Sequence, residues 1–153
     1  MQTTESSPTL VKEVARESLE SLINLHTLSV DTRRGFEKMV EKADPSFLPI
    51  AQRFVALHTR HVARLDVMVR EMGAVPDAAG SVMGTLNRAV VALRAVFDAI
   101  DADVMVQIRQ GEDAVLEAFD RAISTSLPQG HVQALTQMRT ELSGLLDETS
   151  TLG

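Results

Sequence analysis

The segment "ALHTRHVARLDVM" (residues 56–68) has the spacing of an amphipathic α-helix. Its apolar residues, such as Leu65 and Met68, recur at steps of three and four and so lie along one side of a helix. His58 and His61 stand three residues apart within this pattern and project from nearly the same face. The segment therefore predicts a helix with a wide buried band. It leaves open whether the histidines bind a metal ion or only pack in the core.

The same periodicity continues on both sides of this segment. Proline and glycine mark the breaks, at Asp44-Pro45, at Gly73 and within "STSLPQG" (residues 124–130). Gly35 is the expected position of a kink in the long first helix. No segment alternates with period two, so the chain is predicted to be all-α. The predicted helices cover residues 8–43, 46–72, 81–100, 103–122 and 131–149.

The order of these helices predicts the architecture. Two helices, a longer connection and two more helices are typical of a four-helix bundle with one long crossover, here containing the additional helix over residues 81–100. An up-and-down bundle of five helices is the alternative. With 153 residues the chain suits one domain, over residues 8–149. Residues 1–7 and 150–153 are expected to be flexible ends.

Composition narrows the classes of function. The chain contains no cysteine and carries a formal net charge of −6, so thiolate chemistry is excluded and nucleic-acid binding is disfavoured. No signal peptide and no apolar run long enough for a membrane span is visible, which favours a cytoplasmic protein. No nucleophile-elbow or phosphate-loop motif occurs, which favours a protein that is not an enzyme and needs no cofactor.

Three segments carry a resemblance to a known family. They are "DTRRGFEK" (residues 31–38), "VMVREMGAVPDAAGSVMGTLNRA" (residues 67–89) and "IRQGEDAVLEAFDRAI" (residues 108–123). Their order and spacing resemble an uncharacterised bacterial family of four-helix-bundle proteins that is grouped with the ferritin-like superfamily. The family is similar to stress-associated ferritin-like proteins of enteric bacteria. The resemblance implies a ferritin-like bundle and leaves the biochemical role open.

The resemblance also implies where a metal centre would lie. Ferritin-like di-iron sites take one Glu from each of two helices and a Glu-x-x-His pair from each of the other two. By resemblance, His58 and His61 occupy one Glu-x-x-His position, and Glu112 is a candidate for a single Glu. The last helix lacks the second such pair, because Glu141 is followed three residues later by Gly144. The site is therefore expected to be degraded.

Two interpretations of these residues stay open. His58, His61 and Glu112 are candidates for a three-ligand centre for Fe, Mn or Zn. The favoured interpretation has the histidines packing in the core and Glu112 paired with Arg33 or Arg34. Further residues are expected to be structural. A local ion-pair cluster, which includes the Arg33–Glu37 pair, is predicted for Asp31, Arg33, Arg34 and Glu37. His26 and His131 are not expected to form a site, and the methionines are expected to lie in the core.

Together these observations predict a non-enzymatic structural or interaction protein with a degraded ferritin-like metal site. The resemblance suggests a stress-related role. A homodimer is expected, because a wide apolar band on long helices needs more cover than one chain gives. No membrane or nucleic-acid partner is expected. The alternative is a metal-binding ferritin-like protein that uses His58, His61 and Glu112.

Overall fold

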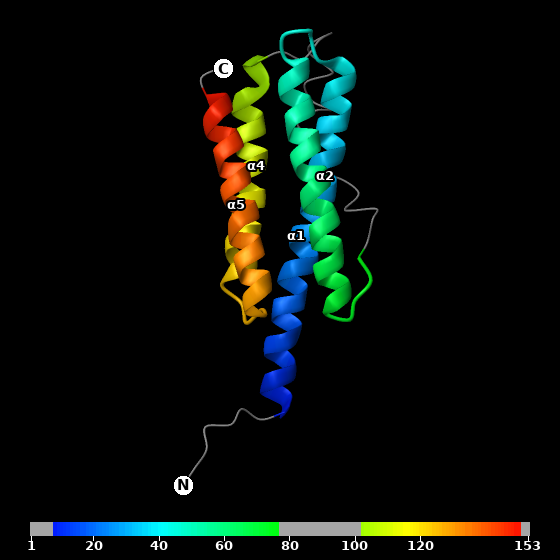
Figure 1. The fold of residues 1–153 in the computed structure, drawn as a ribbon, viewed down its shortest axis with the longest axis vertical. Helices are drawn as coiled ribbons and strands as arrows, with labels where there is room; N and C mark the ends of the chain where they lie inside the picture. Colours follow the sequence, from blue (N-terminus) through cyan, green and yellow to red (C-terminus); the bar gives the residue numbers. More distant parts are fainter. Residues whose placement is uncertain (1–7, 77–101, 151–153) are drawn as a thin grey trace.

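The computed structural model of the protein describes residues 8–76 and 102–150, with side chains from residue 12 onward. Four α-helices occupy these ranges: α1 (Pro8–Lys42), α2 (Leu48–Glu71), α4 (Met105–Ile123) and α5 (Gln129–Thr149), with a 3-10 turn, η1 (Ala102–Val104), leading into α4 (Figure 1). Neither range contains a β-strand, which confirms the all-α prediction for this part of the chain. The predicted helix over residues 81–100 and the predicted flexible ends lie outside the described residues, apart from Ser150.

The helices form two antiparallel pairs, α1 with α2 and α4 with α5 (Figure 1). The helices α2 and α4 run in the same direction. α1 packs along α2 and against α4, and α4 packs against α5. By contrast, α2 and α5 touch at few positions. The bundle therefore has one loosely packed seam, between α2 and α5.

The turn between α1 and α2 is built around Asp44. Its Oδ1 accepts hydrogen bonds from the backbone N–H of Phe47 and from the Ser46 hydroxyl, each at 2.8 Å. These two hydrogen bonds favour the carboxylate and lower the pKa of Asp44. Because this turn occupies the residues up to Phe47, α2 begins at Leu48, two residues later than its predicted start. Pro49 falls in the first turn of α2, where its missing N–H costs nothing.

Two glycines that the sequence singles out are Gly73, which follows α2, and Gly35, which lies inside α1. Gly73 has a φ of +88° and ends α2, in the left-handed conformation that glycine adopts readily. α1 continues through Gly35, in agreement with the predicted helix over residues 8–43. Gly35 is buried, so the bundle packs against α1 at this position.

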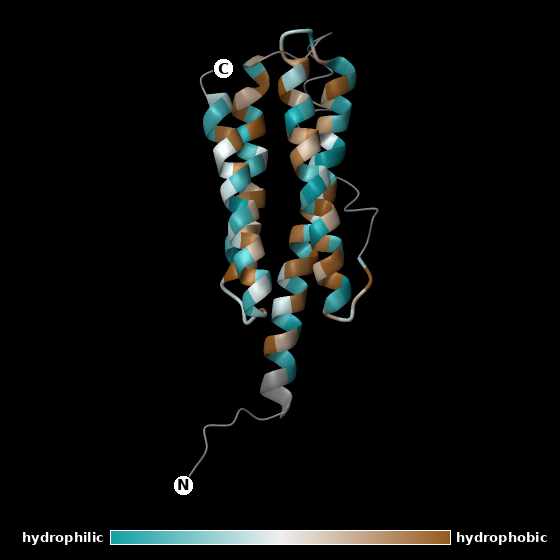
Figure 2. Cartoon of the chain, in the orientation of Figure 1, coloured by the Kyte–Doolittle hydropathy of each residue, from teal (hydrophilic) through white to brown (hydrophobic). Residues whose placement is uncertain are grey.

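The core follows the predicted apolar stripes. Figure 2 shows hydrophobic residues along the sides where the helices face one another and hydrophilic residues on the outer faces. Phe36 of α1 stacks on Phe54 of α2, with ring centroids 4.6 Å apart and planes 4° from parallel. Four methionines are at most 5% exposed, which confirms their prediction as core residues: Met39, Met68, Met105 and Met138. None of the described helices is both long enough and apolar enough to cross a membrane.

Candidate functional site: two buried histidine–glutamate pairs

His58 of α2 and Glu112 of α4 form a pair in the centre of the bundle. His58 Nε2 lies 3.0 Å from Glu112 Oε1 and 2.9 Å from Oε2, so the ring N–H donates to both carboxylate oxygens. Both side chains are 0% exposed. Phe36 covers the imidazole, with its ring centroid 5.8 Å from that of His58. A polar interaction thus joins α2 to α4 within an apolar core.

His61, one turn further along α2, pairs with Glu141 of α5. The distance from His61 Nε2 to Glu141 Oε1 is 2.8 Å. His61 is 3% exposed, whereas the Glu141 side chain is 42% exposed. The rings of Phe119 and His61 are nearly perpendicular, with centroids 6.0 Å apart and planes at 82°. This pair therefore lies at the boundary between the core and the α2–α5 seam.

The two pairs are neighbours. The ring centroids of His58 and His61 are 6.4 Å apart, with the planes nearly perpendicular at 86°. Three helices contribute to this group, which we call the His–Glu layer: His58 and His61 from α2, Glu112 from α4 and Glu141 from α5. The layer holds α2 against α4 and α5 through directional contacts in addition to apolar packing.

The protonation of His61 is biased by its surroundings. Burial lowers the pKa of His61, because the charged imidazolium loses its hydration. The hydrogen bond and the charge of Glu141 oppose this shift, while His58 and Arg60 add to it. The pKa therefore stays below the ordinary value of 6.5, and His61 is neutral near pH 7.

The layer does not have the arrangement of a di-metal centre. Within residues 8–76 and 102–150, no group of three or more His, Cys, Asp or Glu side chains is placed to hold a metal ion. Each histidine Nε2 is directed at one carboxylate, and each Nδ1 is buried without a hydrogen-bond partner in the described structure. A metal ligand instead presents a nitrogen lone pair to the ion. The four side chains are thus arranged as two separate pairs.

The acidic residues offered by α1 do not complete a centre in the described structure. Glu37 is half exposed and forms an i,i+4 ion pair with Arg33, in which Arg33 Nε lies 3.2 Å from Glu37 Oε1. This confirms the predicted Arg33–Glu37 contact. Asp31 is buried but belongs to no ligand group in these ranges. Other buried polar residues of α1 carry hydroxyl groups, for example Ser29 and Thr32.

Two details of the site differ from the prediction. Glu112 was expected to pair with Arg33 or Arg34, and that prediction is wrong, because the partner of Glu112 is His58. Arg33 lies near the helix surface and pairs with the exposed carboxylate of Glu37 on its own helix, whereas the carboxylate of Glu112 is fully buried. The Glu-x-x-His pattern did not predict the contact of Glu141 with His61, because the residue three positions after Glu141 is Gly144. A usable signal was present: Glu141 stands three residues after Met138 and one before Leu142, beside the buried stripe of α5.

The remaining histidines lie apart from the layer. His26 of α1 is 2% exposed, and its Nε2 is 3.9 Å from Asp66 Oδ1 of α2. His131, near the start of α5, has its Nε2 3.6 Å from Glu71 Oε2 at the end of α2. Each histidine is therefore next to one carboxylate of a neighbouring helix.

The comparison with known protein families bears on three of the four residues in the layer. Residues 17–125 match a family described as a domain of unknown function, DUF2383. The chain belongs to the DUF2383 family. The match covers most of α1, all of α2 and all of α4, and so contains His58, His61 and Glu112. Glu141 and the rest of α5 lie beyond the end of the DUF2383 match. No curated protein and no solved structure matches the chain.

Proposed function

We propose that this DUF2383 protein is a ferritin-like helical bundle with a degraded metal site, and that it acts as a non-enzymatic structural or interaction protein. The observation that carries the proposal is the His58–Glu112 pair. Both carboxylate oxygens lie within 3.0 Å of the same ring nitrogen, and neither side chain is exposed. The imidazole of His58 and the carboxylate of Glu112, which are both possible metal ligands, are thus hydrogen-bonded to each other. Their contact stabilises the packing of α2 on α4.

The ferritin-like part of the proposal is supported by the position of the layer. His58 and His61 stand on α2 where such a helix would carry Glu-x-x-His, and Glu112 and Glu141 approach from α4 and α5. The common direction of α2 and α4 is the one that a bundle with a long crossover requires (Figure 1). The helix expected within that crossover, over residues 81–100, stays part of the proposal.

A metal-binding role is the rival proposal. It is favoured by the convergence of two imidazoles and two carboxylates within one layer, since these are ligand types that Fe, Mn and Zn accept. In this role His58, His61 and Glu112 would form the first coordination sphere. The His–Glu hydrogen bonds would then have to break when the ion binds.

Element analysis separates the two roles. Protein produced without a histidine tag, in medium supplemented with Fe, Mn and Zn, is measured for bound metal alongside the His61→Ala variant. The structural proposal expects less than about 0.1 metal ion per chain in both proteins. One ion per chain in the unsubstituted protein, lost in the variant, would establish the rival and overturn the structural role.

A homodimer is also proposed, with α1 as the element that supports it. The N-terminal part of α1 extends beyond the ends of the other three helices that the structure describes (Figure 1). Val14 in this part is 37% exposed. A projecting helix with apolar residues offers a surface to a second copy of the chain. A cytoplasmic location belongs to the same proposal and is supported by the cysteine-free composition, which suits a reducing compartment.

A further inference from the structure

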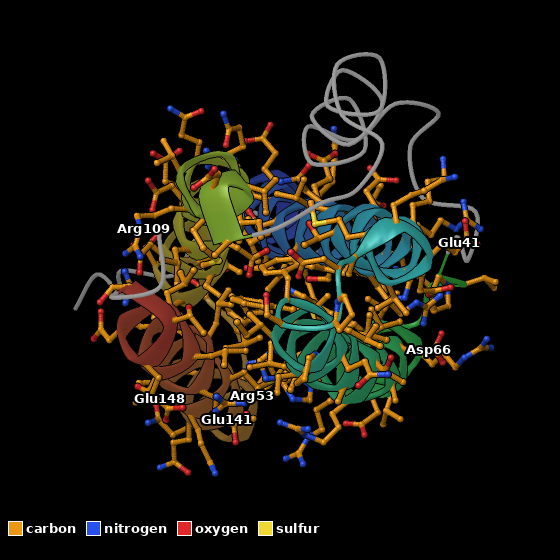
Figure 3. The ribbon with its side chains drawn as sticks, turned by 90° about the horizontal axis from the view of Figure 1, so that it is seen from above. Glu41, Arg53, Asp66, Arg109, Glu141 and Glu148 are labelled. Carbon is orange, nitrogen blue, oxygen red and sulfur yellow. The ribbon has the colours of Figure 1, made fainter. Side chains whose placement is uncertain are left out.

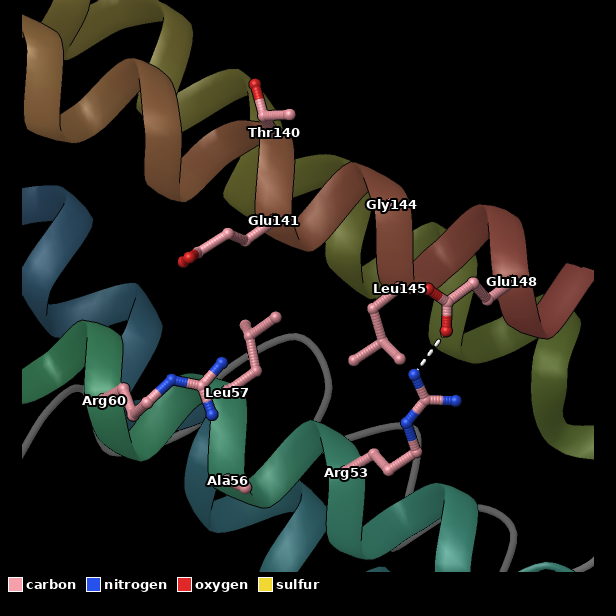
Figure 4. Close-up of a pocket in the computed structure, with 9 residues that line it drawn as sticks. All are labelled: Arg53, Ala56, Leu57, Arg60, Thr140, Glu141, Gly144, Leu145 and Glu148. Atoms are coloured by element: carbon pink, nitrogen blue, oxygen red, sulfur yellow. Dashed lines mark hydrogen bonds and ion pairs between the residues drawn. The ribbon is translucent and has the colours of Figure 1, made fainter.

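The seam between α2 and α5 contains a groove. One hollow of about 390 Å³ lies between Arg53 and Arg60 on α2 and Glu141 and Glu148 on α5 (Figure 4). A second hollow, of about 210 Å³, continues along the seam to Arg64. Arg60 and Glu141 line both hollows, so the two form one groove, which we call the seam groove.

Small residues keep the seam groove open. Ala56 lines its α2 wall and Gly144 lines its α5 wall. A Cβ added at Gly144 would meet no atom within 4 Å, so the space there is not filled by a neighbour. Leu57 and Leu145 also line the groove and are nearly buried. The groove thus offers apolar surface together with charged side chains.

The charges in the groove are unevenly matched. Arg53 is paired with Glu148, and Figure 4 shows this contact closing one end of the groove. Arg60 and Arg64 form no ion pair in the part of the chain that the structure describes. They are four residues apart on α2 and therefore adjacent on one face of the helix. With His61 neutral, the groove carries three arginines against two glutamates, in a chain of net charge −6.

Glu141, the carboxylate opposite these arginines, is already hydrogen-bonded to His61. Figure 3, viewed along the bundle, shows Arg53, Glu141 and Glu148 close together near α5. Glu141 accepts a hydrogen bond from His61 at 2.8 Å, which directs its carboxylate to the buried imidazole. The charge of Arg60 still acts on that imidazole, because it contributes to lowering the pKa of His61. The guanidinium therefore stands beside the layer without a carboxylate of its own.

We propose that the seam groove is a binding site for a small oxyanion, a phosphate or a carboxylate carrying two or more negative charges, held by Arg60 and Arg64. Guanidinium groups bind such anions with paired, charge-assisted hydrogen bonds, and two arginines on one face can share one anion. The apolar surface of Leu57 and Leu145 would contact the carbon skeleton of an organic ligand. The groove is at the lower end of the sizes of small-molecule sites, which favours a compact ligand.

Titration followed by two-dimensional ¹H–¹⁵N NMR tests this site in the full chain. Inorganic phosphate and succinate are added separately at constant ionic strength, which distinguishes phosphate from carboxylate recognition. We expect saturable shifts of the amides of residues 56–64 and 134–145, with a Kd of about 1 mM or below for one of the two probes. Substitutions Arg60→Gln and Arg64→Gln should each weaken that binding about tenfold.

Arg121→Gln is the matched control. Arg121 is exposed on α4 and does not line the seam groove, so its loss changes the net charge equally and should leave the binding unchanged. Shifts that are absent for both probes up to about 20 mM would overturn the proposal, since this concentration lies far above the expected Kd. Binding that survives in the double variant of Arg60 and Arg64, or that weakens equally in the Arg121 variant, would also overturn it. These outcomes do not depend on the metal content that tests the proposed function.

Discussion

His58 and Glu112 depend on each other because neither has any exposed surface. A buried polar group that loses its partner retains the full cost of its lost hydration. Nδ1 of His58 has no hydrogen-bond partner in the described structure. The imidazole therefore depends on the hydrogen bond between its Nε2 and Glu112. His61 shares this dependence only in part, because its partner Glu141 reaches the solvent.

Glu112→Ala should therefore lower the free energy of unfolding by about 3 kcal/mol, through the loss of a buried partner and the small cavity left behind. Glu141→Ala should lower it by about 1 kcal/mol, since water can replace a half-exposed carboxylate. Urea unfolding of the two variants under the same conditions measures the difference. Equal losses would contradict the view that Glu112 is the structural centre of the layer.

The lowered pKa of His61 gives stability a defined pH dependence. In the unfolded chain the imidazole regains its ordinary pKa of 6.5 and binds a proton more readily than in the folded chain. The unfolded state is thus favoured as the pH falls below that value, and the contribution of His61 to stability is fully present only above it. The ¹H resonance of the His61 ring should titrate with a midpoint below 6.5.

A His61→Leu variant supplies the control for this pH dependence. Between pH 7 and pH 5 the free energy of unfolding should fall less in the variant than in the unsubstituted protein, because the variant has no imidazole to protonate at this position. An equal fall in the two proteins, or a midpoint for His61 above 6.5, would contradict the effect of burial.

The identity of the residues in the layer was partly predictable from the sequence. The helical spacing placed His58 and His61 on one buried face, and the family resemblance added Glu112. Their partners were not predictable from local pattern, because Glu112 is 54 residues from His58 and Glu141 is 80 residues from His61. Contacts of this kind depend on the rotation of each helix about its axis, which the width of an apolar band leaves loosely defined.

Among the helices, α5 offers a direct test of the groove and of helix propensity together. Gly144 lies inside α5 with open space at its Cβ position, so Gly144→Ala should raise the free energy of unfolding by about 0.5–1 kcal/mol. Gly73→Ala should lower it by about 1 kcal/mol or more, because the φ of +88° disfavours a side chain. Thermal unfolding of the two variants measures both effects. If Gly144→Ala lowers the stability, the space beside Gly144 in the seam is filled, which would contradict an open groove.

The boundaries of the helices were predicted to within a few residues where proline or glycine sets them. The end of α2 before Gly73 and the start of α5 after Pro128 are examples. The start of α2 was predicted two residues early because the Asp44 carboxylate holds the residues up to Phe47 in a turn. The continuity of α1 through Gly35 agrees with the predicted range of residues 8–43, and the kink at Gly35 stays a prediction.

For the assembled protein, the projecting part of α1 makes self-association measurable. Sedimentation velocity should show a species of two chains, and Val14→Glu should shift it toward one chain by introducing a charge on the exposed apolar surface. Glu20→Lys is a suitable control on the same helix, because it also changes an exposed residue without placing a charge on that apolar surface. A single chain at all concentrations would contradict the dimer.

The bundle as a whole is interpreted as one in which potential metal ligands have become interhelical hydrogen-bond partners. A crystal structure from crystals grown with Mn²⁺ and recorded with anomalous scattering tests this most directly. We predict no anomalous peak in the His–Glu layer and a distance of about 3 Å between His58 Nε2 and the Glu112 carboxylate. A peak bonded to His58, His61 and Glu112, with the His58–Glu112 hydrogen bond broken, would contradict the interpretation.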